Sequence, residues 1–267
     1  MNKAEKALRE LHEMDALAAG SSPLHTLCPL AKLFSTIGYV AAVVSFGKYD
    51  LARLAPLLLW AAALYQLAGI PVGRCFRKLR FVLPLVLATG LFNPLFDRAP
   101  MLTLGGVAVS GGVVSMLTMM AKGTLCLMAS FLLMATTRID ALCAALRRLH
   151  VPGLLVSLLL LTCRYVGVMT EEVAVMSDAY ALRAPGQKGV RFPAWGSFLG
   201  QLLLRSMDRA EELYAAMLLR GYREQFHYAE AAPCAARDAV FLLVSAAVLA
   251  LARFVNIAAL LGGMIVR

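Results

Sequence analysis

Residues 101–135 read MLTLGGVAVSGGVVSMLTMMAKGTLCLMASFLLMA and hold a single charged side chain, Lys122. Four further runs contain few charges or none, at 30–46, 54–72, 81–96 and 239–266. A helix needs about 20 predominantly apolar residues to cross a bilayer, and only helices and closed barrels satisfy their own backbone in lipid. Because these runs lack the alternation of barrel strands, they predict an all-α integral membrane protein.

The composition of the 267 residues agrees with that class. The chain is 60% hydrophobic with a mean hydropathy of +0.73, well above a typical soluble domain. The first 20 residues mix both signs of charge and lack an apolar core before a cleavage site, so they are not a secretory signal. They fit either a short amphipathic helix on the membrane surface or a solvated tail.

The net charge of +10 does not indicate a nucleic-acid partner, because the surplus lies in short loops beside the apolar runs. Its densest cluster is Arg74, Arg77, Lys78 and Arg80, with no acidic residue among them. Cytoplasmic loops of membrane proteins carry such an excess of Lys and Arg. We therefore expect this cluster and the N-terminus to be cytoplasmic.

Counting crossings from that start predicts about five spans plus cytoplasmic helices. The runs 30–46 and 54–72 make one out-and-back pair, 81–96 and 107–135 make a second, and 239–266 crosses outward last. The chain thereby divides into membrane helices at 1–137 (about four spans), a cytoplasmic or membrane-surface coupling-helix module at 138–236, and a C-terminal span at 237–267.

Segment 151–170 is apolar enough to be a sixth span. A crossing there would place the strongly charged segment 171–236 outside the cell. We expect instead a helix that starts at the membrane surface after Pro152 and continues into 171–184. Arg164 supports this placement, because a charge at bilayer depth is costly unless it faces protein.

The cysteines and histidines do not predict a metal site. Six cysteines are scattered without a Cys-x-x-Cys pair, and the four histidines are equally dispersed. We expect free thiols that pack as small apolar side chains.

Two helix-like stretches, 171–184 and 201–223, end in the same way. Each closes on Leu-Arg followed by a small residue, and a pair of such ends outside the membrane suits docking to another protein. A guanidinium is always charged and offers a planar fork to a carboxylate; the alternative is two ordinary C-terminal caps. The candidate docking residues are Leu182, Arg183, Ala184, Leu219, Arg220 and Gly221.

Polar residues at steps of three, four or seven accompany these ends and share a face of each helix. Pro185 and Gly186 then stop the first helix. The residues that we expect to support docking are Glu172, Arg205, Arg209, Glu212 and Arg223.

The chain resembles the transmembrane T component of energy-coupling factor transporters, the family that includes the cobalt-type permease CbiQ. The resemblance covers nearly the whole length, and its most specific features are the two Ala-Arg-Gly-like motifs, here Leu182-Arg183-Ala184 and Leu219-Arg220-Gly221. Cys28 replaces a usual Asp. The other matching strings are Ser22-Pro23-Leu24-His25, Leu27, Pro29, Lys32-Leu33, Phe92-Asn93-Pro94, Thr136-Thr137, Leu146 to Pro152, Arg164-Tyr165 and Arg205 to Glu211.

This resemblance implies a non-catalytic scaffold in a bacterial or archaeal cytoplasmic membrane. Such T components bind two ATP-binding-cassette (ABC) ATPase subunits, identical or different, through two coupling helices. They also hold a small membrane S component that captures a vitamin or a transition-metal ion such as cobalt or nickel. ATP and Mg²⁺ are bound by the ATPases, and no cofactor is expected in this chain.

Two other classes are weaker fits. A conventional ABC-importer permease would need a Gly four residues after a tripeptide like Glu230-Ala231-Ala232, and none is there. An intramembrane hydrolase would need an Arg four residues after Glu171-Glu172, where Met176 stands. The chain also lacks the phosphate-binding loop of an ATPase.

Overall fold

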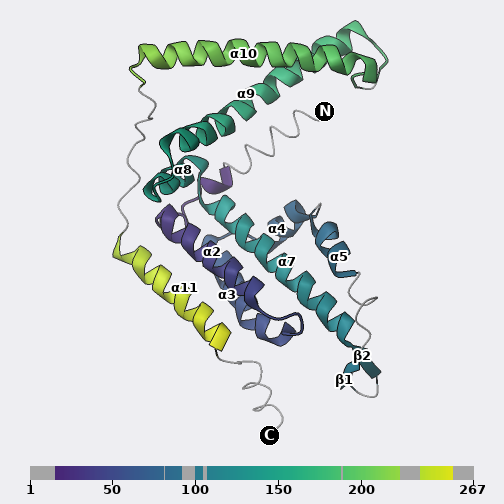
Figure 1. The fold of residues 1–267 in the computed structure, drawn as a ribbon, viewed down its shortest axis with the longest axis vertical. Coiled ribbons are helices and arrows are strands. Elements are labelled where there is room, and N and C mark those ends of the chain that lie inside the picture. Colours follow the sequence, from purple (N-terminus) through teal and green to yellow (C-terminus); the bar gives the residue numbers. More distant parts are fainter. Residues whose placement is uncertain are drawn as a thin grey trace. The chain divides into compact units, whose positions relative to one another are not determined.

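The computed structural model of the chain describes residues 16–80, 82–91, 100–104, 107–187, 189–222 and 235–254. Helices and one short hairpin build the described part (Figure 1). In chain order the elements are α2 Pro29–Ser45, the 3-10 helix η1 Leu51–Leu54, α3 Ala55–Ala68, α4 Val72–Leu79, α5 Leu83–Leu91, β1 Pro100–Leu104, β2 Val107–Ser110, α7 Gly111–Thr136, α8 Ile139–Arg148, α9 Gly153–Arg183, the 3-10 helix η2 Phe192–Ala194, α10 Trp195–Leu219 and α11 Ala236–Phe254.

The chain forms two compact units. Unit 1 comprises residues 1–17 and 138–231, and unit 2 comprises residues 18–137 and 232–267. Unit 2 contains α2 to α7 and α11, whereas unit 1 contains α8, α9 and α10.

The predicted all-α membrane class is confirmed. Each apolar run contains a helix, and α7 and α9 are long and apolar enough to cross a bilayer by length and composition. The helices α2 and α3 are apolar but shorter. The number of spans stays a prediction.

The expectation that a spanning helix begins at residue 107 is wrong. Val107–Ser110 is strand β2, which pairs antiparallel with Pro100–Leu104, and helix α7 begins only at Gly111. The β-branched Val107 and Val109 alternate with small residues, a pattern that favours a pleated strand over a helix. The predicted turn at Asn93-Pro94 lies outside the described residues.

The core of unit 2 is formed where α2, α3, α7 and α11 meet. Its fully buried side chains include Val43 of α2, Leu57 of α3 and Leu125 of α7. The α5 helix packs closely on α7 because position 123 is glycine, and a Cβ there would collide with Val86. Lys122, the one charge in the opening apolar run, donates a hydrogen bond to the carbonyl of Phe46 at the end of α2.

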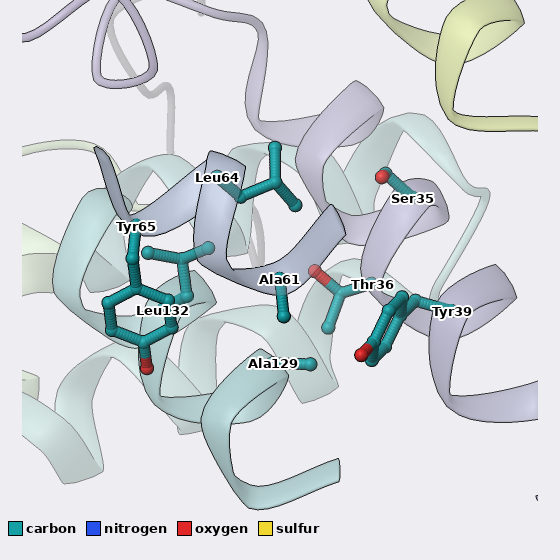
Figure 2. A pocket seen from close by; sticks show the side chains of 8 residues that line it. All are labelled: Ser35, Thr36, Tyr39, Ala61, Leu64, Tyr65, Ala129 and Leu132. Atoms are coloured by element: carbon teal, nitrogen blue, oxygen red, sulfur yellow. The ribbon is translucent and has the colours of Figure 1, made fainter. Parts of the chain in front are cut away.

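Figure 2 shows a small pocket among α2, α3 and α7 in this core. Two tyrosines that line it connect neighbouring helices. The hydroxyl of Tyr39 donates to the carbonyl of Leu57 at 3.0 Å, and that of Tyr65 donates to the carbonyl of Met128 at 2.9 Å. These bonds satisfy the hydroxyls in an apolar setting, where an unpaired polar group would be costly.

A buried lysine ties three segments of unit 2 together. Lys32 is only 5% exposed, and its ammonium donates to the carbonyls of Thr136 at 2.8 Å and His25 at 3.1 Å. Nearby, the carboxylate of Asp238 accepts hydrogen bonds from the backbone N–H groups of Cys28 and Ala235. The contact to Ala235 is half of a capping box at the start of α11.

The prediction of free thiols holds for four of the cysteines and fails for one. Cys75, Cys126, Cys143 and Cys163 are free. Cys28 is disulfide-bonded, and its partner lies outside the described residues. The sequence spacing does not reveal this pairing, because only tertiary structure brings distant cysteines within bonding distance.

Candidate docking site

The candidate docking residues lie on α9 and α10, two long helices of unit 1 that are joined by residues 184–194 (Figure 1). Helix α9 runs without a break from Gly153 to Arg183, which confirms the predicted continuity of 151–170 with 171–184. Gly186 and Gly189 adopt φ values of 89° and 80° in the connection. Glycine reaches this left-handed region at little cost, so the chain reverses here.

The first docking end is the C-terminus of α9. Arg183 is its last residue, and Leu182 beside it is 84% exposed. The N–H of Ala184 donates to the carbonyl of Tyr180 at 3.1 Å and closes the last turn. The Tyr180 hydroxyl donates to the Gln187 side chain at 3.2 Å, which fixes the connection against the helix. The sequence analysis did not single out Tyr180.

The second docking end is the C-terminus of α10, which is capped by a different hydrogen-bond pattern. Arg220 follows the last helical residue, and Gly221 takes a φ of 79°. The N–H of Tyr222 donates to the carbonyl of Met217 at 3.0 Å, and that of Gly221 donates to Leu218 at 2.9 Å. These two bonds define a Schellman motif, which needs a left-handed residue after the cap. The exposed fraction of Leu219 is 90%.

The four described supporting residues come together between the two helices. The Arg205 guanidinium of α10 pairs with the Glu172 carboxylate of α9. Arg209 lies 3.7 Å from Glu212, one turn further along α10. All four line one open pocket between the helices, with Asp208. The fifth predicted residue, Arg223, lies outside the described residues.

These ion pairs change the expected role of the polar stripe. The Glu172–Arg205 pair links α9 to α10 within unit 1. The charge of Arg205 is therefore paired inside this chain. By contrast, Arg183 and Arg220 form no ion pair with any residue that the structure describes. The two candidate docking arginines thus differ from Arg205 and Arg209, which pair with carboxylates of unit 1.

The two docking ends are far apart. Arg183 lines a pocket with Ala194 and Ser197, at the N-terminal end of α10. Arg220 caps the opposite end of that 25-residue helix. At a rise of about 1.5 Å per residue the helix separates the two ends by roughly 35 Å.

Much of the apolar surface of α10 is uncovered. No residue of α10 is buried, and its apolar side chains Leu203, Leu204 and Tyr214 are each more than half exposed. Contiguous apolar surface of this kind marks a protein or membrane contact. Among the described residues, no three His, Cys, Asp or Glu side chains gather in a way that suits a metal ion.

A pair of long helices that end in arginines, in a chain rich in apolar helices, is found in a known class of transport subunit. The sequence profile described as "Cobalt transport protein" (CbiQ) matches residues 20–228. The chain belongs to this family, and it is a membrane transport subunit of the energy-coupling factor type.

Three relatives illustrate the family. The energy-coupling factor transporter transmembrane protein EcfT of Bacillus selenitireducens is 28% identical over 269 residues, which cover 86% of this chain and 93% of the relative. BioN of Rhizobium etli is 35% identical over 29% of this chain and 38% of the relative. The nickel permease LarQ of Lactiplantibacillus plantarum is 32% identical over 34% of this chain and 33% of the relative. The aligned part thus spans about a third of the length of BioN and of LarQ.

Proposed function

We propose that this chain is the transmembrane coupling subunit of an energy-coupling factor importer. In this proposal two cytoplasmic ABC ATPase subunits bind the C-terminal ends of α9 and α10. Closure of the ATPases on ATP moves these two helices, and the membrane helices transmit the movement to a small S component that carries the substrate. Hydrolysis takes place in the ATPases, and the N-terminus of this chain is cytoplasmic.

The observation that carries the proposal is the pair of exposed Leu-Arg helix ends. Leu182 and Leu219 are the most exposed leucines described, at 84% and 90%, and each precedes an arginine without an ionic partner among the described residues. An exposed leucine beside a cation matches a partner groove that is apolar with an acidic rim. The negative end of the helix dipole also favours a cation at each position.

The distance between the two ends supports two partner subunits. A separation of roughly 35 Å, from the rise of α10, is too large for one groove of a single small domain. Two copies of the same kind of groove, one on each ATPase, would accept the two similar motifs. The two motifs differ only in their small third residue, Ala184 or Gly221, so the proposal fits two identical ATPase subunits as well as two different ones.

The substrate class follows from the family and not from this chain. A vitamin or a transition-metal ion such as cobalt or nickel is proposed, because the family profile and LarQ carry metal names. Selectivity resides in the S component under this proposal.

The test is the double variant Arg183→Glu with Arg220→Glu. Each reversal leaves an acidic partner facing a like charge, at a cost of about 3–5 kcal/mol where that partner is buried; about 1.4 kcal/mol is tenfold in affinity. We expect the variant to insert normally, to lose ABC ATPases in mild-detergent co-purification from native membranes, and to lose substrate uptake.

The matched control is Arg191→Glu, an exposed arginine in the connection between α9 and α10 that is part of neither helix end. It should retain the ATPases and uptake. Normal ATPase recovery with the double variant would contradict the proposal, as would equal loss with the control.

A further inference from the structure

Helix α4 has two sharply different sides. Its inner side contains Cys75, which is fully buried and whose sulfur lies 3.0 Å from the hydroxyl oxygen of Tyr65. Arg74 and Arg77 are exposed, and one helical turn separates them. At that spacing two side chains lie on one face, about 5–6 Å apart at Cβ. The sequence analysis expected a loop here, whereas the structure forms a helix.

Among the described residues, no carboxylate pairs with these arginines. The sequence contains no Asp or Glu between Asp50 and Asp97 and none between Asp97 and Asp140, so α4 and the helix α7 against which it packs are free of acidic residues. Neither Arg74 nor Arg77 forms an ion pair within the described part of the chain. Two adjacent cations on an element without acids form an electropositive site.

Exposed apolar side chains lie on α4 and on the helix that follows it in sequence. Phe76 is 44% exposed on α4 itself, and Leu85 is 68% exposed at the start of α5. In sequence, α4 lies between the apolar helices α3 and α5. A short basic segment with apolar flanks suits the boundary between headgroups and acyl chains, whereas an aqueous polyanion would leave those side chains in water.

We propose that Arg74 and Arg77 bind the phosphate of an anionic glycerophospholipid. A guanidinium matches phosphate with two parallel hydrogen bonds, and two of them one turn apart can clamp one headgroup. Phe76 and Leu85 would then face the acyl chains. The site orders a lipid at the turn between α3 and α5, and it does not depend on which proteins bind α9 and α10.

The experiment is native mass spectrometry of the full chain in mild detergent, titrated with phosphatidylglycerol or phosphatidylcholine. The wild type should retain phosphatidylglycerol at low micromolar lipid and should retain phosphatidylcholine at least fivefold less. The variant Arg74→Gln with Arg77→Gln should lower phosphatidylglycerol retention at least fivefold without changing that of phosphatidylcholine.

A charge-matched control separates a site from general attraction. Arg53→Gln with Arg138→Gln removes the same two charges, but each of these arginines already lies near a carboxylate, Asp50 at 3.8 Å and Asp140 at 3.7 Å. The control should retain phosphatidylglycerol like the wild type. An equal fall in the control, or equal retention of both lipids by the wild type, would overturn the proposal.

Single variants keep the test decisive if the double variant aggregates. Arg74→Lys and Arg77→Lys preserve the charge and remove the planar fork. We expect each to lower phosphatidylglycerol retention about twofold to threefold. Unchanged retention in both variants would show that only the positive charge attracts the lipid, and it would overturn the proposed site.

Discussion

Lys32 is the clearest case of a single residue that organises several segments. Its ammonium reaches the carbonyl of Thr136, the last residue of α7, and the carbonyl of His25 before α2. Carbonyls at a helix C-terminus have no partner within the helix. Lys32 therefore caps α7 and fixes the segment that leads into α2 by the same side chain.

Replacing Lys32 by methionine should destabilise the protein strongly. Methionine keeps the length and removes the donor, so the buried carbonyl of Thr136 loses a partner at a cost of about 1–3 kcal/mol, and the partly buried carbonyl of His25 loses one at a smaller cost. We expect a lower midpoint of thermal aggregation in detergent, measured by fluorescence-detected size exclusion.

The matched control for Lys32→Met is Thr26→Val in the same segment. Thr26 is exposed and its hydroxyl bonds only to the nearby carbonyl of Pro23, so this change should shift the midpoint little. If Lys32→Met is as stable as the control, then the cap contributes little to the fold.

At the scale of elements, the brace between α9 and α10 is the feature with a testable consequence. The Glu172–Arg205 pair links the helices about ten residues from their connection. Both side chains are partly solvated, with 30% and 46% exposed, so the pair contributes at most about 1 kcal/mol. Its role is to set the relative position of the helices more than to hold the unit folded.

A charge swap tests the brace. Glu172→Arg or Arg205→Glu alone places like charges opposite each other, and a penalty of about 1 kcal/mol predicts roughly fivefold slower substrate uptake. The double variant Glu172→Arg with Arg205→Glu should recover to within about twofold of wild type, because the pair re-forms with opposite polarity. Failure of the swap to rescue would mean that each residue contacts a different group.

At the scale of the whole molecule, the two units differ in how much of their apolar surface is buried. Unit 2 has a buried core, whereas α9 buries only Val156 and Ser157 and α10 buries none of its residues. Helix α9 is long and apolar enough to span a bilayer, yet its continuation carries the charged docking end. We expect α9 to lie at the cytoplasmic surface, with its apolar side on lipid or on a partner.

Two free cysteines of unit 1 report on this topology. Cys163 of α9 is exposed, whereas Cys143 of α8 is buried, and burial raises the pKa of its thiol and lowers its reactive thiolate fraction. A membrane-impermeant maleimide should label Cys163 in inverted vesicles and not in intact cells. It should leave Cys143 unlabelled until the protein is denatured.

The variant Cys163→Ser identifies the labelled site. It should abolish the native-state signal in inverted vesicles while the denatured signal remains. Labelling of Cys163 that occurs from neither side would place this part of α9 inside the bilayer and contradict the predicted surface helix.

The apolar runs by themselves predicted the helical membrane class. Unpaired backbone groups are costly in lipid, so only helices and closed barrels can span a bilayer. The motif pair at Arg183 and Arg220 was equally visible, since a helix end followed by a small residue or a Pro-Gly stop is a local signal. The continuity of α9 from Gly153 to Arg183 was also predicted correctly, from the charge of the segment that follows it, and no proline interrupts the sequence between Pro152 and Pro185.

Other features depended on tertiary structure. The β1–β2 hairpin replaced the predicted helix start at 107, because strand pairing is decided by contacts that an apolar run does not specify. The bond of Lys32 to Thr136 and the pairing of Glu172 with Arg205 join residues that are 104 and 33 positions apart in sequence. The disulfide at Cys28 was likewise not predicted from the sequence. Periodicity and composition are local, so they identify which residues a helix presents and not which distant groups those residues meet.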